Sequence, residues 1–164
     1  MKWLLSAAAL LLFGAFLYQQ RTAPKSSYVN GLPEYNQLPG KEFIFQRDCY
    51  IFKFKDRDTD WPLVGTHQVV PALPAVVDRK NVGADLPDVR ILSVVRTGWI
   101  VRLVSIRRDE SRQGTNLTYE LLILDEGEKL YTRLDAYHLL DHSSDASGAA
   151  PAFLPDYVAP RIKK

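Results

Sequence analysis

Two histidines near the end of the chain have the spacing of a metal-binding pair. His138 and His142 are four residues apart, so a helix would place both imidazoles on one face, and Asp135, Asp141 and Asp145 could supply further ligands. Only one or two helical turns fit here, and the second histidine runs into a serine-rich stretch. Polar surface residues explain the same pattern, so we expect no metal site and keep His138 and His142 as the candidates.

An acidic repeat begins like a calcium-binding loop. Asp56, Asp58 and Asp60 match the first three ligand positions of an EF-hand. The match ends there, because Trp61 stands where the loop needs glycine and His67 where it needs a bidentate glutamate. The sequence excludes an EF-hand and favours a solvated acidic turn, and the alternative is a weak calcium site in this loop.

Motifs for nucleophilic catalysis and for phosphate binding are absent from the sequence. It contains no G-x-S-x-G, no H-E-x-x-H and no glycine-rich phosphate loop. The one cysteine, Cys49, lies in a strand-like apolar run without a nearby histidine, which predicts a structural, half-buried thiol. We therefore expect a non-enzymatic protein without a cofactor.

The only basic cluster follows a predicted strand and comprises Arg102, Arg107, Arg108 and Arg112. Asp109 and Glu110 interrupt it, and cross-strand pairing with Glu120 is a structural explanation for these charges. The alternative is a site that recognises an acidic partner or a glycan. The whole chain carries 21 Lys and Arg against 19 Asp and Glu, a net charge of +2, which argues against a nucleic-acid partner.

The N-terminal segment, residues 1–21, predicts where the protein is located. Lys2 precedes an unbroken apolar run, residues 3–18, which spans roughly 24 Å as a helix, somewhat less than the ~30 Å hydrocarbon core. No pair of small residues suitable for signal peptidase follows the run, and no lipid-attachment cysteine follows it either. We favour an uncleaved single-pass anchor in the inner membrane of a bacterium over a cleaved signal peptide.

Orientation is decided by few charges, because Lys2 and the α-amino group stand on one side and Arg21 and Lys25 on the other. A short, positively charged N-terminus usually stays inside, so we expect the following domain on the periplasmic side. The alternative is a cytoplasmic domain on an inverted anchor.

The rest of the chain divides into three parts. Residues 22–39 contain three prolines and no apolar periodicity, which predicts an extended linker. Residues 40–142 are expected to form one folded domain, since this length supports one core but not two. Residues 143–164 form a proline-containing C-terminal tail.

The predicted domain consists of short strands. Residues 42–56 alternate like a strand or tight hairpin, with a bulge or turn near Arg47–Asp48, and residues 89–96 and 99–107 are expected to pair as a hairpin around Gly98. A polar loop precedes further strands at 117–125 and 129–135, and a helical turn closes the domain. Between the first strand and the hairpin lies an irregular excursion that we expect to be pinned by Trp61, Leu63, Val69, Val70, Leu73 and Val76.

This order of strands resembles an SH3-like barrel over residues 40–142. The fold class is therefore all-β, with a small antiparallel barrel preceded by a membrane-anchor helix. An OB-like barrel or a small sandwich would give a similar order of strands. SH3-like barrels have many unrelated roles, so the resemblance implies no particular function.

The C-terminal tail contains bulky apolar residues that disordered tails usually lack. Either it packs back over the barrel or it is a docking peptide. We expect a membrane-anchored, exported accessory protein that binds a protein partner, and the expected contact residues are Phe153, Leu154, Tyr157, Val158, Arg107 and Arg108. The alternative is a peptidoglycan-binding module with a groove lined by Trp61, Trp99 or Tyr119.

Overall fold

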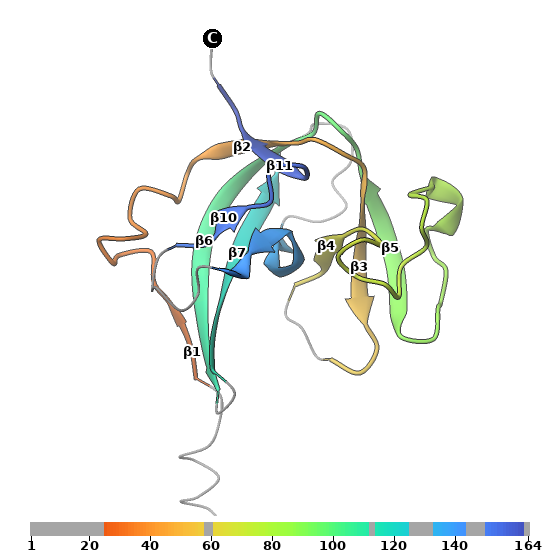
Figure 1. Ribbon diagram of the computed structural model, residues 1–164, viewed down its shortest axis with the longest axis horizontal. Coiled ribbons are helices and arrows are strands. Elements are labelled where there is room, and N and C mark those ends of the chain that lie inside the picture. The colour runs from red at the N-terminus through yellow and green to blue at the C-terminus, as the bar shows by residue number, and fades with distance from the viewer. Residues whose placement is uncertain (1–24, 58–60, 112–113, 125–132, 144–149, 163–164) are drawn as a thin grey trace, which may run out of the picture.

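A computed structural model describes residues 25–57, 61–111, 114–124, 133–143 and 150–162, which form an all-β unit (Figure 1). The strands are β1 (Lys25–Tyr28), β2 (Glu42–Phe45), β3 (Cys49–Phe54), β4 (Leu63–Gly65), β5 (Val89–Val95), β6 (Ile100–Ser111), β7 (Gly114–Ile123), β8 (Leu134–Asp135), β9 (Leu140–Asp141), β10 (Ala152–Phe153) and β11 (Val158–Pro160). The 3₁₀ turns η1 (Arg79–Asn81) and η2 (Tyr137–Leu139) lie between them. The predicted anchor lies outside these residues, and within them no helix is long and apolar enough to cross a membrane.

Nine strands form one sheet in the order β11-β2-β6-β7-β8-β4-β3-β5, with β1 paired to β6 beside β2. β9 and β10 form a separate two-stranded ladder. All pairs are antiparallel except β4 with β8. Among the residues described, β11 and β5 end the sheet without pairing to each other, so the predicted all-β class is confirmed but no closed barrel is found.

The sheet is organised around one long, bent two-stranded ribbon. β2 and β3 follow each other along one side of it, and β6 and β5 along the other, with Ile44 opposite Ile100 and Cys49 opposite Val95. Backbone hydrogen bonds continue across the bend, from Phe45 N to Trp99 O (3.0 Å) and from Gly98 N to Phe45 O (2.8 Å). The predicted hairpin between 89–96 and 99–107 is therefore wrong, because the two strands continue each other and do not pair.

Gly98 explains why the local sequence pattern predicted a hairpin that does not form. It has a φ of +86°, the positive φ that the sequence predicted. The same backbone conformation suits a tight hairpin turn and a corner between two strands of one ribbon. Because β6 pairs with β2 and β5 pairs with β3, the chain forms a corner at Gly98 and not a hairpin turn.

Asp48 holds this corner together from the opposite strand. Its carboxylate accepts hydrogen bonds from the Thr97 backbone N–H (2.8 Å) and hydroxyl (2.9 Å), and it pairs with the Arg96 guanidinium (2.5 Å). Burial raises the pKa of Asp48, but these hydrogen bonds and the Arg96 charge outweigh it, so the pKa lies below its ordinary value.

We expect Asp48→Ala to lower the free energy of unfolding by about 1–3 kcal/mol, because it leaves the Thr97 and Arg96 donors without their acceptor. A carboxyl whose pKa is lowered on folding stabilises the fold fully above its unfolded pKa, near 3.9, and loses this contribution as the pH falls through the folded value. Urea titrations between pH 7 and pH 2 should therefore show the difference between wild type and variant shrinking in acid. A constant difference would contradict this account, and exposed Asp56→Ala is the control.

Two apolar cores lie on opposite faces of the sheet. The larger contains the inward side chains of β2, β6 and β7, with Phe45, Leu103 and Leu121 at 0% exposure. The smaller lies between β3–β5 and the excursion after β4, where Val70 and Leu73 are buried. Val76, which we expected to pin the excursion, is 73% exposed, and only its carbonyl is engaged, by the Tyr50 hydroxyl (2.6 Å).

The β6·β7 hairpin is longer than the sequence predicted. Its register runs to Ser111 opposite Gly114, so most of the predicted polar loop at 109–116 is strand. Polar residues are tolerated there because β1 pairs with the same end of β6, placing Lys25 opposite Glu110 and Ser26 opposite Asp109. Pairing with β1, which is distant in sequence, thus extends the strand into a stretch that has no apolar alternation.

The predicted linker is part of the folded unit from Lys25 onward. Beyond β1, Val29 is 5% exposed and Tyr35 is fully buried in the larger core. Tight turns carry this segment, with Leu32 N bonded to Val29 O and Leu38 N to Tyr35 O. The expected boundary at Gly40 is wrong because prolines and turns here bring two core residues into place.

The tail also packs against the sheet. β11 pairs with β2, placing Val158 opposite Phe45, and β10 pairs with β9, placing Phe153 opposite Leu140. Of the two predicted alternatives, the described tail residues show the packed one. β11 thereby becomes an end strand of the sheet (Figure 1).

Candidate functional site

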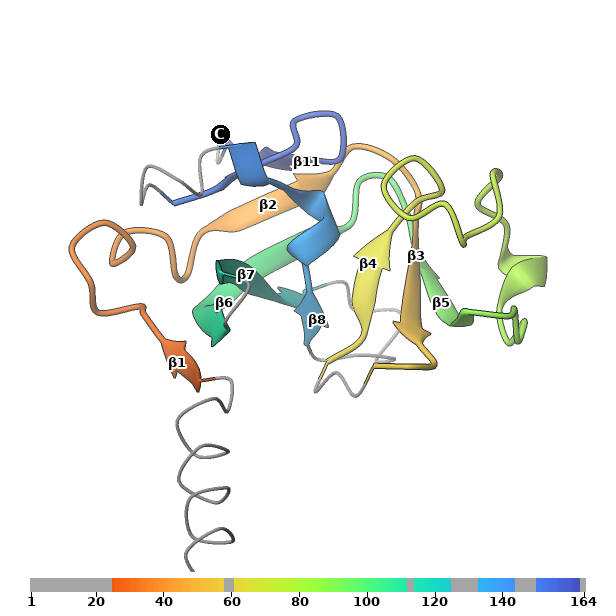
Figure 2. The same cartoon turned by 60° about the horizontal axis from the view of Figure 1, so that its bottom comes forward.

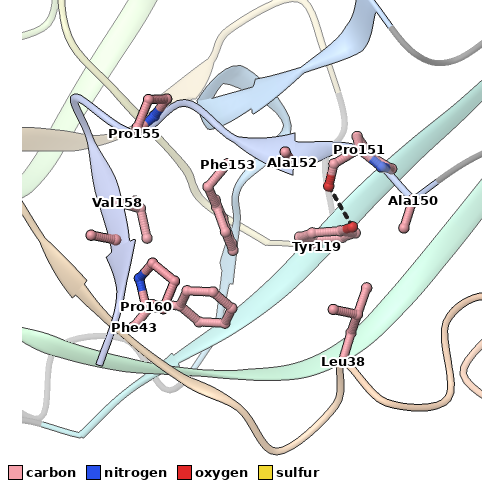
Figure 3. A pocket seen from close by; sticks show the side chains of 11 residues that line it. Leu38, Phe43, Tyr119, Ala150, Pro151, Ala152, Phe153, Pro155, Val158 and Pro160 are labelled. Carbon is pink, nitrogen blue, oxygen red and sulfur yellow. Dashed lines mark hydrogen bonds between the residues drawn. The ribbon is translucent and has the colours of Figure 1, made fainter. Parts of the chain in front are cut away.

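The C-terminal tail and the sheet enclose an apolar pocket, which is the candidate site (Figure 3). Phe153 is the residue of the tail that reaches deepest toward the sheet aromatics. Its ring lies edge-on to Phe43 of β2 (centroids 4.7 Å apart) and to Tyr119 of β7 (5.4 Å). Aromatic pairs of this geometry add about 0.5–1.5 kcal/mol to the burial of their apolar area.

Hydrogen bonds fix the tail around these rings. The Tyr119 hydroxyl donates to the Pro151 carbonyl (2.6 Å; Figure 3), and Gln46 N donates to Tyr157 O (2.8 Å). Burial raises the pKa of Tyr119 well above its ordinary value, so this hydroxyl remains a donor throughout the physiological range. The wall of the pocket is therefore built by the chain itself.

The pocket has a volume of about 380 Å³ and is open to solvent on one side. Its lining consists of apolar side chains together with the Tyr119 ring, namely Leu38, Phe43, Tyr119, Ala150, Pro151, Ala152, Phe153, Pro155, Val158, Ala159 and Pro160. A hollow of this size and polarity takes up apolar groups.

A second hollow of about 530 Å³ shares Leu38, Phe43 and Pro160 with the pocket. Its other walls carry charge, from Lys41, Glu42 and Arg161. We call the side chains of Lys41, Arg102 and Arg161, together with the Glu42 carboxylate between the two arginines, the cationic rim.

Within the cationic rim, Glu42 is shared by two guanidinium groups. Arg102 lies 3.0 Å and Arg161 2.8 Å from its two oxygens. The Glu42 side chain is 11% exposed, whereas those of Arg102 and Arg161 are 45% and 38% exposed. The cations thus face solvent and the carboxylate does not.

The expected partner contacts divide into three groups in the structure. Phe153 and Leu154 are half-buried against the larger core and Phe153 lines the pocket, whereas Tyr157 and Val158 are 5% and 1% exposed and belong to that core. Val158 lines the pocket despite its low exposure, whereas Tyr157 is not part of the lining, so the role of these two residues as partner contacts stays a prediction.

Arg107 and Arg108 lie on β6, away from the pocket, near β1. Arg107 pairs with Asp109 (3.1 Å) and lies 3.6 Å from Asp135. The expected partner of the basic cluster, Glu120, is opposite Ser105 instead. Arg112 lies outside the described residues.

Glu120 is the centre of a buried polar cluster on the sheet face opposite the larger core. It is fully buried, and it accepts hydrogen bonds from Ser105, from Tyr28 (3.2 Å) and from the Trp61 indole (3.2 Å). Arg133 lies 3.7 Å away as its counter-charge. Since these donors already occupy the carboxylate, the cluster has the features of a structural network.

Asp135, opposite Glu120 on β8, is engaged in the same way. It accepts hydrogen bonds from the Thr118 hydroxyl and from the Tyr137 backbone N–H (2.8 Å). Burial raises its pKa, against the lowering effect of these bonds and of the Arg107 charge.

The two candidate histidines do not share a helical face. Residues 137–139 form the single 3₁₀ turn η2 and β9 follows, so the i, i+4 geometry does not arise. His138 lies among the rings of Phe52, Phe54 and Tyr137, while His142 Nε2 lies 2.8 Å from the Tyr137 carbonyl. Within the described part of the chain, no three His, Cys, Asp or Glu side chains gather in a way that would hold a metal ion.

Burial lowers the pKa of His138 to about 4, helped by the charges of Arg57 and His142. The unfolded chain takes up this proton near pH 6.5 and the folded chain only near pH 4, so stability falls as the pH drops between these values. We expect His138→Gln to flatten the fall in urea midpoint between pH 7 and pH 4.5. A midpoint that falls as steeply in the variant as in wild type would contradict this assignment.

The remaining candidates are separated in space. Trp61 contacts Glu120 and Arg133, Trp99 lies at the ribbon corner, and of these three aromatic residues only Tyr119 reaches the pocket.

Cys49 is fully buried rather than half-buried, and burial raises its pKa to about 12, which suits the predicted structural role. Of the acidic repeat, Asp58 and Asp60 lie outside the described residues.

Sequence reasoning missed the residues that line the pocket from the N-terminal side. Leu38 was assigned to the linker, and Phe43 to an ordinary strand. Lys41, which lines the second hollow, was assigned to the start of the domain. The recurrent Leu-Pro pairs in residues 32–39 were the available signal, since disordered linkers are poor in leucine. No protein family model, no curated protein and no solved structure matches the chain.

Proposed function

We propose that this chain is a membrane-anchored, non-enzymatic accessory protein that binds another protein through the apolar pocket beside its C-terminal tail. The observation that carries the proposal is the pocket itself. Its walls are apolar, open to solvent and fixed by the chain's own hydrogen bonds. Preformed apolar hollows with few polar groups are typical of binding sites, and rigid walls reduce the entropic cost of association.

The position of β1 supports the anchored arrangement. β1 begins at Lys25, four residues after the end of the predicted anchor at Arg21, a distance of at most about 14 Å in an extended chain. An apolar segment in the membrane would thus hold the β1 end of the sheet close to the lipid surface. The periplasmic side and the inner membrane belong to this proposal on the grounds of the N-terminal charge pattern.

The test is crosslinking and affinity capture of the full-length chain from membranes, beside variants with single changes. A chain ending at Ser143 is a poor comparison, since it lacks β10 and β11 and would lose binding by unfolding. Exposed Ala152, on the pocket wall, allows Ala152→Phe to block the pocket without removing core residues. We expect one stoichiometric protein with wild type and its loss with Ala152→Phe, and no specific protein with either chain would refute the function.

We also propose an SH3-like arrangement of strands, in place of the closed barrel that the sequence predicted. The bent ribbon of β2–β3 and β5–β6 supports it, because strands that continue around a corner are how small barrels curve. Peptidoglycan binding remains the alternative function, and sedimentation of the full-length protein with purified sacculi tests it. Binding that survives Ala152→Phe and requires Trp61 or Trp99 would favour the alternative.

A further inference from the structure

We infer that the pocket and the cationic rim recognise an extended, acidic segment of a partner protein, with an apolar side chain in the pocket and carboxylates on the rim. This inference rests on the proposed function and specifies the chemistry of the partner. Four observations carry it, namely the size of the pocket, the charge beside it, the edge at which it lies and its distance from β1.

The size of the pocket fits side chains. About 380 Å³ is at the lower end of the volumes of small-molecule sites, roughly 300–1,000 Å³, and Phe43, Phe153 and Tyr119 present ring surfaces to it. Aromatic and proline-lined hollows of this kind favour rigid apolar groups such as proline, leucine or phenylalanine side chains.

The charge beside the pocket is positive. Lys41, Arg102 and Arg161 carry three positive charges and Glu42, which pairs with the two arginines, carries one negative charge, so the cationic rim has a net charge of +2. Lys41 is exposed, and its ammonium group has no carboxylate partner among the described residues. Guanidinium groups that already bind Glu42 on one side keep donors for a second carboxylate on the other. An acidic segment therefore complements this surface, and a basic one does not.

The edge of the sheet at this site presents an incomplete set of backbone groups to another strand. Tyr157 O and Arg161 N bond to β2, so alternation along β11 turns the backbone groups of Val158 and Pro160 outward. The Val158 N–H is already bonded to Leu154 O, and proline has no N–H. β11 thus offers outward carbonyls but no free N–H donor to a partner strand, so a regular strand ladder cannot form there and recognition relies mainly on side chains.

The distance between the pocket and β1 favours a protein partner over a lipid. Along β6, Lys25 of β1 pairs with Glu110, whereas Phe43 of β2 pairs with Val101. Nine residues of strand separate these positions by about 30 Å, and Figure 2 shows β1 at the lower left and β11 at the top of the molecule. A chain tethered through β1 directs the pocket away from the membrane and toward soluble segments of other proteins.

The experiment uses the full-length chain in detergent micelles and an array of ten-residue peptides. Each peptide has two acidic residues at either end and a centre that samples proline, leucine and phenylalanine, and a matched array carries lysine at the ends. The best acidic binder is then measured by fluorescence anisotropy. We expect acidic peptides to bind, their affinity to fall about tenfold or more with Ala152→Phe and severalfold with Lys41→Glu, and to weaken with added salt.

Matched variants control for general effects. Ala75→Phe and Lys80→Glu make the same changes at exposed sites away from the pocket, and they should leave affinity unchanged. The inference would be overturned if the acidic and lysine-ended peptides bound equally well or if neither bound. It would also be overturned if Ala152→Phe left the affinity for the acidic peptide unchanged. Phosphatidylglycerol vesicles that bind through Lys41 and Ala152 while no peptide does would overturn it as well, since that result assigns the site to lipid.

This experiment can fail independently of the proposed function. If membrane capture returns a partner with wild type and loses it with Ala152→Phe while no acidic peptide binds, the proposed function stands and only the acidic chemistry of this inference is lost. If capture returns the same partner with Ala152→Phe, binding through the pocket is refuted. If capture returns no partner at all, the function itself is refuted.

Discussion

Replacing Tyr35 by alanine should lower the free energy of unfolding by about 3–5 kcal/mol, the usual cost of deleting a buried aromatic ring. Tyr35 is fully buried in the larger core, although it lies in a stretch whose composition is typical of a linker. Since small domains are stable by only about 5–15 kcal/mol, this one change would remove much of the total. Urea unfolding followed by tryptophan fluorescence measures it.

Glu34→Ala is the matched control for Tyr35→Ala. Its side chain is exposed in the same turn, so we expect a change within about 0.5 kcal/mol. If Tyr35→Ala cost no more than Glu34→Ala, the segment between β1 and β2 would not be part of the core in solution, and the pocket would lose the wall that Leu38 provides.

Tyr157→Ala should have an effect of similar size, about 3–5 kcal/mol, because Tyr157 fastens the tail to the sheet. It is 5% exposed, its hydroxyl donates to Gln68 (2.9 Å) and lies 3.2 Å from Thr66 Oγ1, and the Arg47 guanidinium lies 4.6 Å from its ring centroid. Losing this ring should also open the pocket, whose wall is the tail. Chemical denaturation gives the stability, and protease cleavage after residue 143 reports release of the tail.

Two further variants separate the contributions at Tyr157. Tyr157→Phe keeps the ring and removes the hydroxyl, for an expected loss of about 0.5–1.5 kcal/mol. Ile162→Ala changes a side chain that is 85% exposed and should change stability little. If Tyr157→Ala left stability and tail protection unchanged, the tail would be free in solution, and the pocket described here would not persist.

Tyr35 and Tyr157 lie in segments, the linker and the tail, whose sequences do not predict a place in the core. Proline and turn residues dominate both segments, so neither shows the periodicity that identifies a strand or helix. Each contributes a few apolar side chains to a core that is built mainly elsewhere, Tyr35 from one segment and Tyr157 and Val158 from the other. Such contacts depend on the surface they meet, which is formed by β2, β6 and β7.

The sequence by itself determined the features that depend on neighbouring residues. Alternation of apolar side chains predicted the all-β class and the break at Arg47–Asp48, and both are confirmed. The glycine at position 98 predicted a positive φ and residues 136–140 a helical turn, which the structure has as η2. The apolar run at residues 3–18 and the lack of catalytic motifs are properties of composition and spacing, and the proposed location and class of function derive from them.

Only the tertiary structure decided which strands pair. One strand pattern fits either a hairpin at Gly98 or a ribbon that bends there, because local backbone geometry is the same in both. The choice depends on burying Phe45, Cys49 and Val95 in one core, a contact between residues about 50 positions apart in sequence. The pocket follows from that choice, since β11 and Phe153 dock only where the bent ribbon and Tyr119 have already formed a surface.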